Sequence, residues 1–304
     1  MLTLKKLQKQ AGIRFFTTFI EIKNIMKKFL FILSILFIGC ETTNRDNATW
    51  SFDSSTGDYI EWQSENDFAN EMTNAGFSHL YNVEYEKAKV FFEKALEYDP
   101  SLFGPHVVLA GLSPEGSEKS LMHIEKAKEN VKDNNETSNL FVTLLDTKRQ
   151  SRWWPLLGPE AHEKWAEMRS VEPKGKLIHY YYAFTVPGME NKIKEMEGLL
   201  AEIRDGVGES ESLAVSGDHS YMIAPILNVL GYFYYGQGDK EKAKSLFEEY
   251  IENYPSGYNP YDSMGEFYYN EGDLDNAKIF YSKAVENYFG ASTANGKLTE
   301  LTIG

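Results

Sequence analysis

Cysteine is almost absent from this 304-residue chain. Cys40 is the only one, so neither an intramolecular disulfide nor a cysteine-based metal cluster can form. Proline is also scarce, with ten residues, whereas Glu, Lys, Ala and Leu are frequent, a composition that favours helix. The main apolar run, residues 29–38, is shorter than the roughly 20 residues of a membrane-spanning helix. The 42% hydrophobic content nevertheless suffices for a folded core.

Basic residues are sparse outside the first 39 positions. Seven of the 31 basic residues and one of the 45 acidic residues lie in 1–39, which leaves the rest of the chain with a formal charge of −20. A body this acidic repels phosphate backbones, so we expect no nucleic-acid partner. It suits a protein or peptide partner that is neutral or basic.

The segment that starts at Met26, MKKFLFILSILFIGC, has the layout of a signal peptide over residues 26–39, with two lysines followed by ten apolar residues. Residues 1–25 place a long mixed stretch ahead of these lysines, so we expect Met26 to be the true start. The end of the segment resembles the lipobox of bacterial lipoproteins, although Phe37 stands where Leu is usual. An ordinary core helix or an uncleaved anchor is the alternative interpretation.

The lipoprotein resemblance implies that Cys40 is lipidated, becomes the first mature residue and holds the protein to a membrane. Asp after the Cys often retains such proteins at the inner membrane; this chain has Glu41, which implies an outer-membrane lipoprotein facing the periplasm or the cell surface. Residues 41–66 are polar and lack a helical period, which predicts a tether. Packing of their aromatic residues onto the first helices is the alternative. The predicted organisation is a leader over 1–39, the lipidated Cys and tether over 40–66, and a folded body over 67–304.

Small residues recur with a fixed period in the body. Gly, Ala and Pro are spaced 12 and 12 at positions 76, 88 and 100 and again at 231, 243 and 255, and Gly265 and Ala277 follow 34 residues after the second set. Aromatic residues accompany them, as at Phe92, Phe247 and Tyr281. These marks define repeats at 69–102, 224–257 and 258–291. They resemble the tetratricopeptide (TPR) family, and the last repeats are similar to the terminal repeats of many TPR proteins from Bacteroidetes.

The resemblance implies an all-α fold, a TPR-type α-solenoid of about six antiparallel helix pairs. We expect the periodic glycine of each repeat to lie where two helices cross, with an aromatic ring filling the space beside it. Gly-Asp at 238–239 and 272–273 predicts the end of one helix and the cap of the next. Weaker pairs are predicted over 104–131, over 137–173, where Trp165 replaces the usual Phe, and over 176–205. A loop is expected at 205–219 and a closing helix after Ser292.

In TPR proteins the first helix of each pair lines a concave groove, and repeat positions 2, 5, 9, 12 and 13 point into it. The resemblance assigns the following residues to a partner-binding groove: Asn70, Thr73, Phe77, Tyr81, Asn228, Tyr232, Tyr235, Asn259, Asp262, Glu266, Tyr269 and Asn270. The family's clamp for acidic peptides uses Lys and Arg at these positions, whereas this chain has carboxylates. Tyr and Asn suit recognition of an extended peptide. Simple exposure without a binding role is the alternative.

No motif for catalysis, metal binding or a cofactor emerges. The six histidines show no ligand spacing, and no Gly-x-Ser-x-Gly is present. We therefore predict no enzyme activity, no metal and no cofactor. The leading hypothesis is a membrane-anchored scaffold that binds a protein or peptide partner in the cell envelope. The alternatives are a surface lipoprotein that captures glycans or nutrients, and an accessory lipoprotein of an outer-membrane assembly machine.

Overall fold

The computed structural model describes residues 66–131, 136–149, 153–158, 160–173, 175–208, 222–288 and 290–303. The chain divides into two compact units, 1–47 and 48–304, and every described residue belongs to the second. The predicted signal peptide, Cys40 and nearly all of the tether therefore lie outside the described residues. Helix α2 begins at Asp67, and Asn66 caps it by accepting hydrogen bonds from the backbone N–H groups of Phe68 and Ala69.

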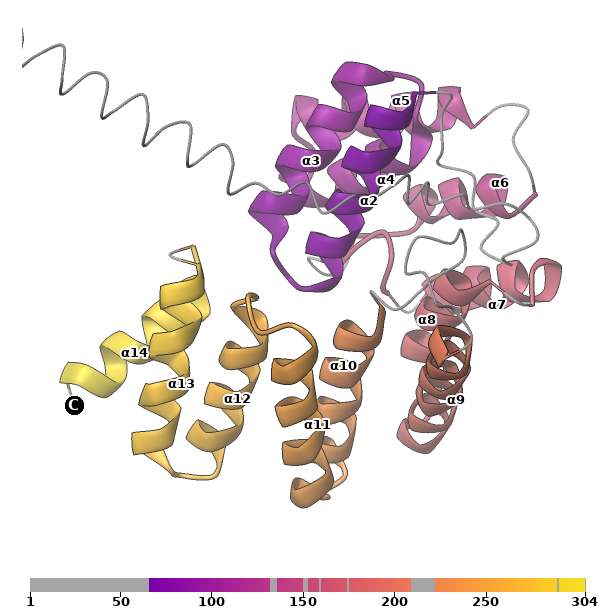
Figure 1. Ribbon diagram of the computed structural model, residues 1–304. Helices are drawn as coiled ribbons and strands as arrows, with labels where there is room; N and C mark the ends of the chain where they lie inside the picture. The colour runs from indigo at the N-terminus through magenta and orange to yellow at the C-terminus, as the bar shows by residue number, and fades with distance from the viewer. Residues whose placement is uncertain are drawn as a thin grey trace, which may run out of the picture. The chain divides into compact units, whose positions relative to one another are not determined.

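Six helix pairs and a final helix make up the described body, and no strand occurs in the residues described (Figure 1). The first three pairs are α2 (Asp67–Tyr81) with α3 (Tyr85–Tyr98), α4 (Phe103–Leu112) with α5 (Glu118–Asn130), and α6 (Glu136–Val142), extended by the 3-10 turn η1 (Thr143–Asp146), with α7 (Ala161–Val171). The last three are α8 (Lys176–Thr185) with α9 (Met189–Gly208), α10 (Ile223–Gly236) with α11 (Lys240–Asn253), and α12 (Asn259–Asn270) with α13 (Leu274–Asn287). Helix α14 (Ser292–Ile303) follows. The predicted all-α solenoid of about six pairs is confirmed.

Glycine permits the close crossing of the two helices in the three clearest repeats. A Cβ atom added to Gly76 would lie 2.7 Å from the Phe92 ring, and one added to Gly231 would lie 2.5 Å from the Phe247 ring. At Gly265 the nearest atom would be Cδ1 of Tyr281, at 2.7 Å. All three rings are buried. The ring of the second helix thus occupies the volume that a side chain on the first would need, as the repeat spacing predicts.

The turns between paired helices follow the predicted Gly-Asp chemistry. Gly238 and Gly272 have φ angles of 86° and 80°, in the left-handed region that favours glycine. Asp239 and Asp273 then cap α11 and α13 by accepting hydrogen bonds from the N–H groups of Lys242 and Asn276. Each turn therefore ends one helix and starts the next within three residues.

In the weaker central repeats the bulkier ring of Trp165 packs both within its own helix pair, on Phe141, and against the next pair. Trp165 on α7 is fully buried and donates from Nε1 to the Leu156 carbonyl at 2.8 Å, and its ring stacks on Tyr181 of α8 at 4.6 Å between centroids. Helix α9 is longer than the sequence predicted, since it continues to Gly208 through the first part of the expected 205–219 loop. The buried apolar residues Leu199, Leu200 and Ile203 anchor its second half, so the helix does not end where polar residues first appear. The rest of that loop lies outside the described residues.

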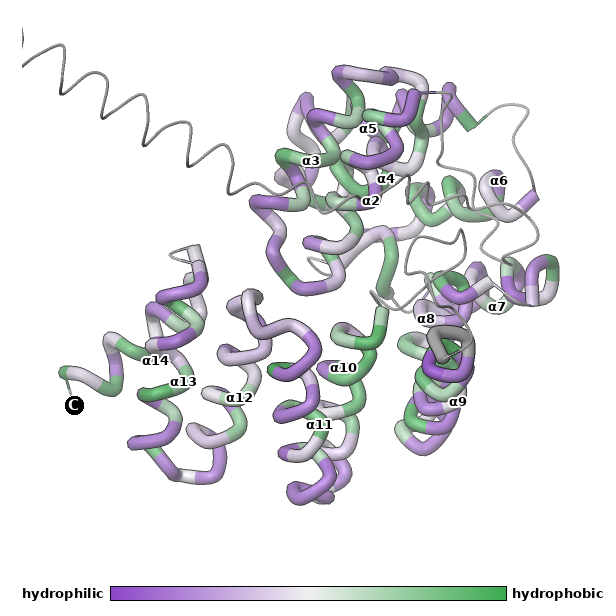
Figure 2. The backbone as a smooth tube through the Cα atoms, in the orientation of Figure 1, coloured by the Kyte–Doolittle hydropathy of each residue, from purple (hydrophilic) through white to green (hydrophobic). Residues whose placement is uncertain are grey.

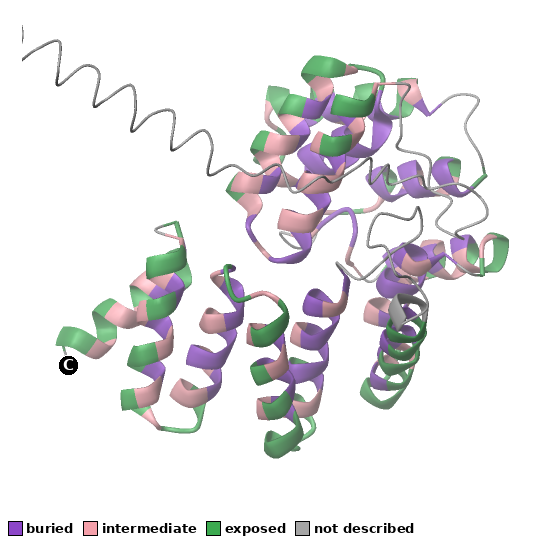
Figure 3. Cartoon of the chain, in the orientation of Figure 1, coloured by how far each residue is buried: buried purple, intermediate pink, exposed green. Residues whose placement is uncertain are grey.

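Hydropathy varies from helix to helix in a way that matches burial. The outer helices α3, α5, α11 and α13 carry a polar, exposed face, whereas α4 is buried from Phe103 to Gly111 and α10 is largely apolar (Figures 2 and 3). A helix that is apolar on most sides needs neighbours on most sides. Helix α4 packs against α3 and α5, and α10 packs against α9 and α11. The remaining side of each helix lines the cavity described below.

The first helix pair also contacts the last two pairs, far away in sequence. The Tyr250 hydroxyl donates to Asn82 Oδ1 at 3.1 Å, and the Tyr258 hydroxyl donates to the Val83 carbonyl at 2.9 Å. The Tyr254 hydroxyl donates to Glu84, which is 1% exposed and ion-paired with Lys87. Burial opposes ionisation of Glu84, but hydrogen bonds from His79 and Lys87 outweigh it and hold its pKa below the ordinary value. We call the contact of Asn82, Val83 and Glu84 with Tyr250, Tyr254 and Tyr258 the closure.

Candidate functional site

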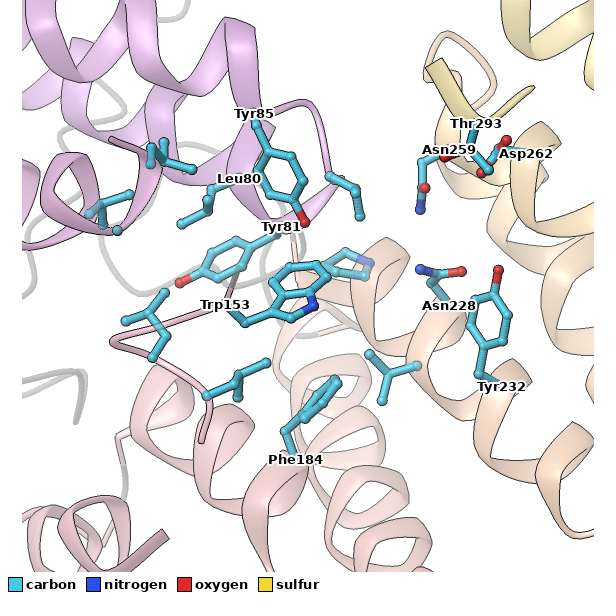
Figure 4. Close-up of a pocket in the computed structure, with 18 of the residues that line it drawn as sticks. Leu80, Tyr81, Tyr85, Trp153, Phe184, Asn228, Tyr232, Asn259, Asp262 and Thr293 are labelled. Carbon is cyan, nitrogen blue, oxygen red and sulfur yellow. The ribbon is translucent and has the colours of Figure 1, made fainter. Parts of the chain in front are cut away.

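A cavity of about 600 Å³ lies among the first helices of the pairs (Figure 4). Helices α2, α4, α8, α10 and α12 line it together with α14, whereas of the second helices only α3 contributes, through the two residues at its start. The turn 153–157, the closure residues Val83 and Tyr258, and Tyr288 and Gly290 between α13 and α14 complete the lining. The cavity therefore lies on the face that the repeat fold gives to its first helices.

One wall of the cavity is aromatic. Trp153 packs edge-on against Tyr85 with ring centroids 5.5 Å apart, and Phe184 lies 5.8 Å from Phe233. Leu80, Val108, Leu112 and Leu157 extend the apolar surface between them. We call Tyr85, Trp153, Phe184 and Phe233 the aromatic wall.

The turn that carries Trp153 is fixed by its neighbours. Trp154 donates from Nε1 to the Thr147 carbonyl at 2.8 Å, and Arg149 donates from Nη2 to the Gly111 carbonyl at 2.8 Å. The guanidinium of Arg149 also lies 5.5 Å from the Trp154 ring centroid. These contacts hold the turn against the end of α4, so Trp153 has a defined position beside the cavity.

The opposite wall is polar and comes from α10 and α12. Asn228 and Tyr232 lie one turn apart on α10, and Asp262 and Glu266 occupy the equivalent positions 34 residues later on α12. The Tyr232 hydroxyl donates to Glu266 Oε2 at 2.6 Å, and Ser263 donates to Asn228 Oδ1 at 2.8 Å. Figure 4 shows Asn228, Tyr232, Asn259 and Asp262 on one side of the space and Trp153 and Phe184 on the other.

Among the residues described, no basic side chain contributes to the pKa of the Asp262 carboxyl. Its Oδ1 atom is buried and has no hydrogen-bond partner in the part of the chain that the structure describes. Burial, and then the negative charge of Glu266, raise the pKa of Asp262 to about 7. Near neutral pH this group therefore exchanges readily between its neutral and ionised forms, which a bound ligand could bias.

The structure brings together only part of the groove predicted from sequence. The predicted residues that line the cavity are Tyr81, Asn228, Tyr232, Asn259, Asp262 and Glu266. Thr73 and Phe77 lie instead in the core of the first pair, with exposures of 1% and 4%. Their face of α2 is covered because Phe77 packs on Phe92 and Tyr81 packs on Tyr180 of α8.

The other predicted groove residues lie outside the cavity lining. Asn70 is half-buried on α2 and Asn270 is exposed at the end of α12. Tyr235 donates to Glu271 at 3.0 Å, and Tyr269 donates to Glu300 at 2.6 Å, each across to the following helical layer. These hydroxyls stabilise the stacking of repeats in the same way that Tyr232 does within the cavity.

Sequence reasoning missed Tyr85 and Trp153 of the aromatic wall, together with the turn that carries Trp153. Trp153 and Leu157 belong to a turn, and Tyr85 begins a second helix, so no groove position of the repeat points to them. One signal was present: the run WWPLL at 153–157 is apolar although it interrupts the helical period. An apolar turn of this kind must either pack inward or line a binding surface.

Two further observations concern the rest of the described body. No group of three or more His, Cys, Asp or Glu residues there is arranged to hold a metal ion. Among the helices described, none combines the length and the apolar character needed to cross a bilayer.

The fold and the cavity define a helical-repeat scaffold of the α-solenoid class. Comparison with protein families identifies the repeats: residues 73–102 and 258–288 match a family described as tetratricopeptide repeat, and residues 230–257 match a second family of the same description. The chain therefore contains TPR repeats, which are typical of protein–protein interaction. Curated protein sequences give no match.

Three solved structures to which this chain is similar come from different sources. Yeast Tom70 is 15% identical with a TM-score of 0.46, over 82% of this chain and 53% of that one, so this chain spans about half the length of Tom70. TTC0263, a thermophilic TPR protein of Thermus thermophilus, is 16% identical with a TM-score of 0.33, over 78% of this chain and 100% of that one. The type IV pilus biogenesis factor PilW is 13% identical with a TM-score of 0.31, over 79% and 94%.

Proposed function

We propose that this chain is a membrane-anchored TPR scaffold of the cell envelope that binds a protein or peptide partner in its cavity. The observation that carries the proposal is the cavity of about 600 Å³ on the face formed by the first helices, with an aromatic wall opposite polar side chains. Aromatic rings supply contact area, and amide and hydroxyl groups can pair with a peptide backbone. A volume of this size accommodates a short extended segment or a few side chains.

The envelope part of the proposal comes from the sequence. The lysine pair, the apolar run and Cys40 at its end support a lipid anchor. An anchored scaffold would present the cavity to partners on one side of a membrane. The acidic body supports a partner of neutral or basic character.

Site-specific photo-crosslinking tests the proposal in the native cell. A photoreactive residue replaces Thr293, which is exposed at the edge of the cavity on α14, and in a separate variant replaces Thr299, which is exposed on the same helix away from the cavity. We expect a discrete crosslinked protein from position 293 and none from position 299. Equal crosslinking from both positions, or no protein adduct from either, contradicts the assignment.

Glycan capture is the second candidate, because Trp153 presents its indole ring to the cavity and such rings can stack on sugars. It predicts that no protein adduct forms at position 293 and that an oligosaccharide shifts the NMR signal of the Trp153 indole. The identity of a crosslinked protein separates a general scaffold from an accessory subunit of an outer-membrane assembly machine.

A further inference from the structure

Resting on the proposed function, we infer that the cavity binds a basic side chain of the partner, Lys or Arg. Its charged end lies at Asp262 and Glu266, and its aliphatic stem lies along the aromatic wall.

Charge complementarity is the first argument. The charged residues that line the cavity are Glu86, Asp262 and Glu266, and no Lys, Arg or His occurs among the lining residues that the structure describes. Ion pairs elsewhere in the body, such as Lys240 with Glu271 at 2.8 Å, show that acidic side chains are paired where a basic residue lies close. The cavity is left with a negative charge that a ligand can neutralise.

The arrangement of the two carboxyl groups is the second argument. Glu266 is held by the Tyr232 hydroxyl, while Asp262 Oδ1 lacks a hydrogen-bond partner among the described residues. A buried carboxylate without a hydrogen-bond donor is unfavourable. An ammonium or guanidinium group placed beside Asp262 would therefore contribute more binding free energy than a neutral group. The carboxyl groups are one helical turn apart on α12, so a single cation can interact with both.

The aromatic wall supplies the third argument. Lysine and arginine have long apolar stems, which pack on rings while the charged end reaches a polar region. Aromatic faces also attract cations directly. An acidic side chain would be repelled by Asp262 and Glu266. A purely apolar side chain would leave the buried Asp262 carboxyl without a hydrogen-bond donor.

Protonation of Asp262 gives the inference a pH signature. Burial and Glu266 hold the pKa of Asp262 at about 7, and a bound cation would lower it by favouring the ionised form. Glu266 on the same helix, Tyr232 on α10 and Tyr281 on α13 interact electrostatically with it, and burial and these carboxyl groups raise the pKa of both tyrosines. Glu86 on α3 also lines the cavity. At pH 6 Asp262 is mostly neutral and at pH 8 mostly ionised, so binding strengthens about tenfold between these values.

The experiment titrates the full chain with capped peptides Gly-Ala-X-Ala-Gly, in which X is Lys, norleucine or Glu, and follows the indole signals by NMR. We expect the Lys peptide to bind at least tenfold more tightly than the norleucine peptide at pH 8, and the Glu peptide to bind most weakly. Asp262→Asn should remove both the preference for Lys and the pH dependence. The matched control Asp275→Asn changes an exposed residue of α13 outside the cavity lining and should leave both unchanged. Circular dichroism establishes that both variants fold.

Three results would overturn the inference: equal affinity for the Lys and norleucine peptides, no binding of the Lys peptide at millimolar concentration, or binding of a neutral oligosaccharide in place of the peptides. The crosslinking experiment at Thr293 separates these failures from failure of the proposed function. A protein adduct at Thr293 together with no preference for Lys means that a partner binds there through other chemistry. No adduct and no peptide binding refute both proposals.

Discussion

The substitution Gly265→Ala tests whether helix crossing in the repeats depends on the missing side chain. Alanine favours helix over glycine by about 1 kcal/mol, so the change alone would stabilise α12. The new Cβ would, however, lie 2.7 Å from Cδ1 of Tyr281, a ring that is 1% exposed and cannot move away without shifting α13. Overpacking of this kind costs about 1–3 kcal/mol. We therefore expect a net loss of stability of up to about 2 kcal/mol.

Gly198→Ala is the matched control. Gly198 lies in the middle of α9, is exposed, and has no atom within 4 Å of the position that a Cβ would take. The same substitution there should stabilise the protein by about 0.5–1 kcal/mol. The two variants should therefore differ by about 1–3 kcal/mol, which corresponds to several degrees in Tm.

Repeat arrays need not unfold in one step, so urea denaturation is combined with hydrogen exchange of the α12–α13 amides. Loss of protection should be greatest there in Gly265→Ala. If the Tyr281 ring causes the loss, adding Gly265→Ala to a Tyr281→Leu variant should cost less than adding it to the wild type. Equal stabilisation by Gly265→Ala and Gly198→Ala would refute the helix-crossing explanation.

Two other predictions concern the anchor and the buried histidine pair. Cys40→Ser should yield a protein that no longer incorporates a palmitate analogue in its native cell and leaves the membrane fraction, since no other cysteine can accept lipid; continued labelling of the variant would contradict the lipobox interpretation. His123 lies with its Nδ1 atom 2.8 Å from His106 Nδ1, and burial, then repulsion from His106, lower its pKa from 6.5 to about 4. Because the unfolded chain takes up the proton first, the contribution of His123 to stability is full above about pH 6.5 and decreases by up to about 3 kcal/mol as pH falls towards 4. Asp262, whose folded pKa is raised, contributes in the opposite direction, so the dependence is measured as the difference between the wild type and His123→Asn. His123→Asn should weaken this dependence, and an unchanged slope in urea denaturation at pH 7 and pH 5 would exclude His123 as its source.

The repeat period could be predicted from sequence because it arises from local packing. Gly265 and Tyr281 are 16 residues apart and contact each other within one helix pair. The residues that determine how the two helices pack therefore lie within a single repeat. The caps at Asp239 and Asp273 are equally local, since each bonds an N–H group three residues ahead. Local rules of this kind are repeated every 34 residues, and three copies suffice to establish them.

The closure could not be predicted in this way. Tyr250 reaches Asn82 across 168 residues, and Tyr258 reaches Val83 across 175, with no periodic signal to connect them. The closure and the packing of α8 on α2 decide which faces remain open. For that reason equivalent repeat positions have different surroundings: Thr73 and Phe77 are buried, while Asn228, Tyr232, Asp262 and Glu266 line a cavity.

Core and cavity residues share a helix in these repeats but lie on different faces of it. On α12, Gly265 and Met264 are buried against neighbouring helices, whereas Asp262 and Glu266 line the cavity. Substitution of a cavity residue therefore leaves the helix crossing intact. The last two repeats share the same Gly and aromatic positions, but the first of them presents Asn228 and Tyr232 to the cavity and the second presents Asp262 and Glu266. The same separation makes Asp262→Asn an informative test, because the variant changes the charge of the cavity without changing the volume of the core. A preference for Lys that disappears in a fully folded Asp262→Asn variant would have to originate in the cavity.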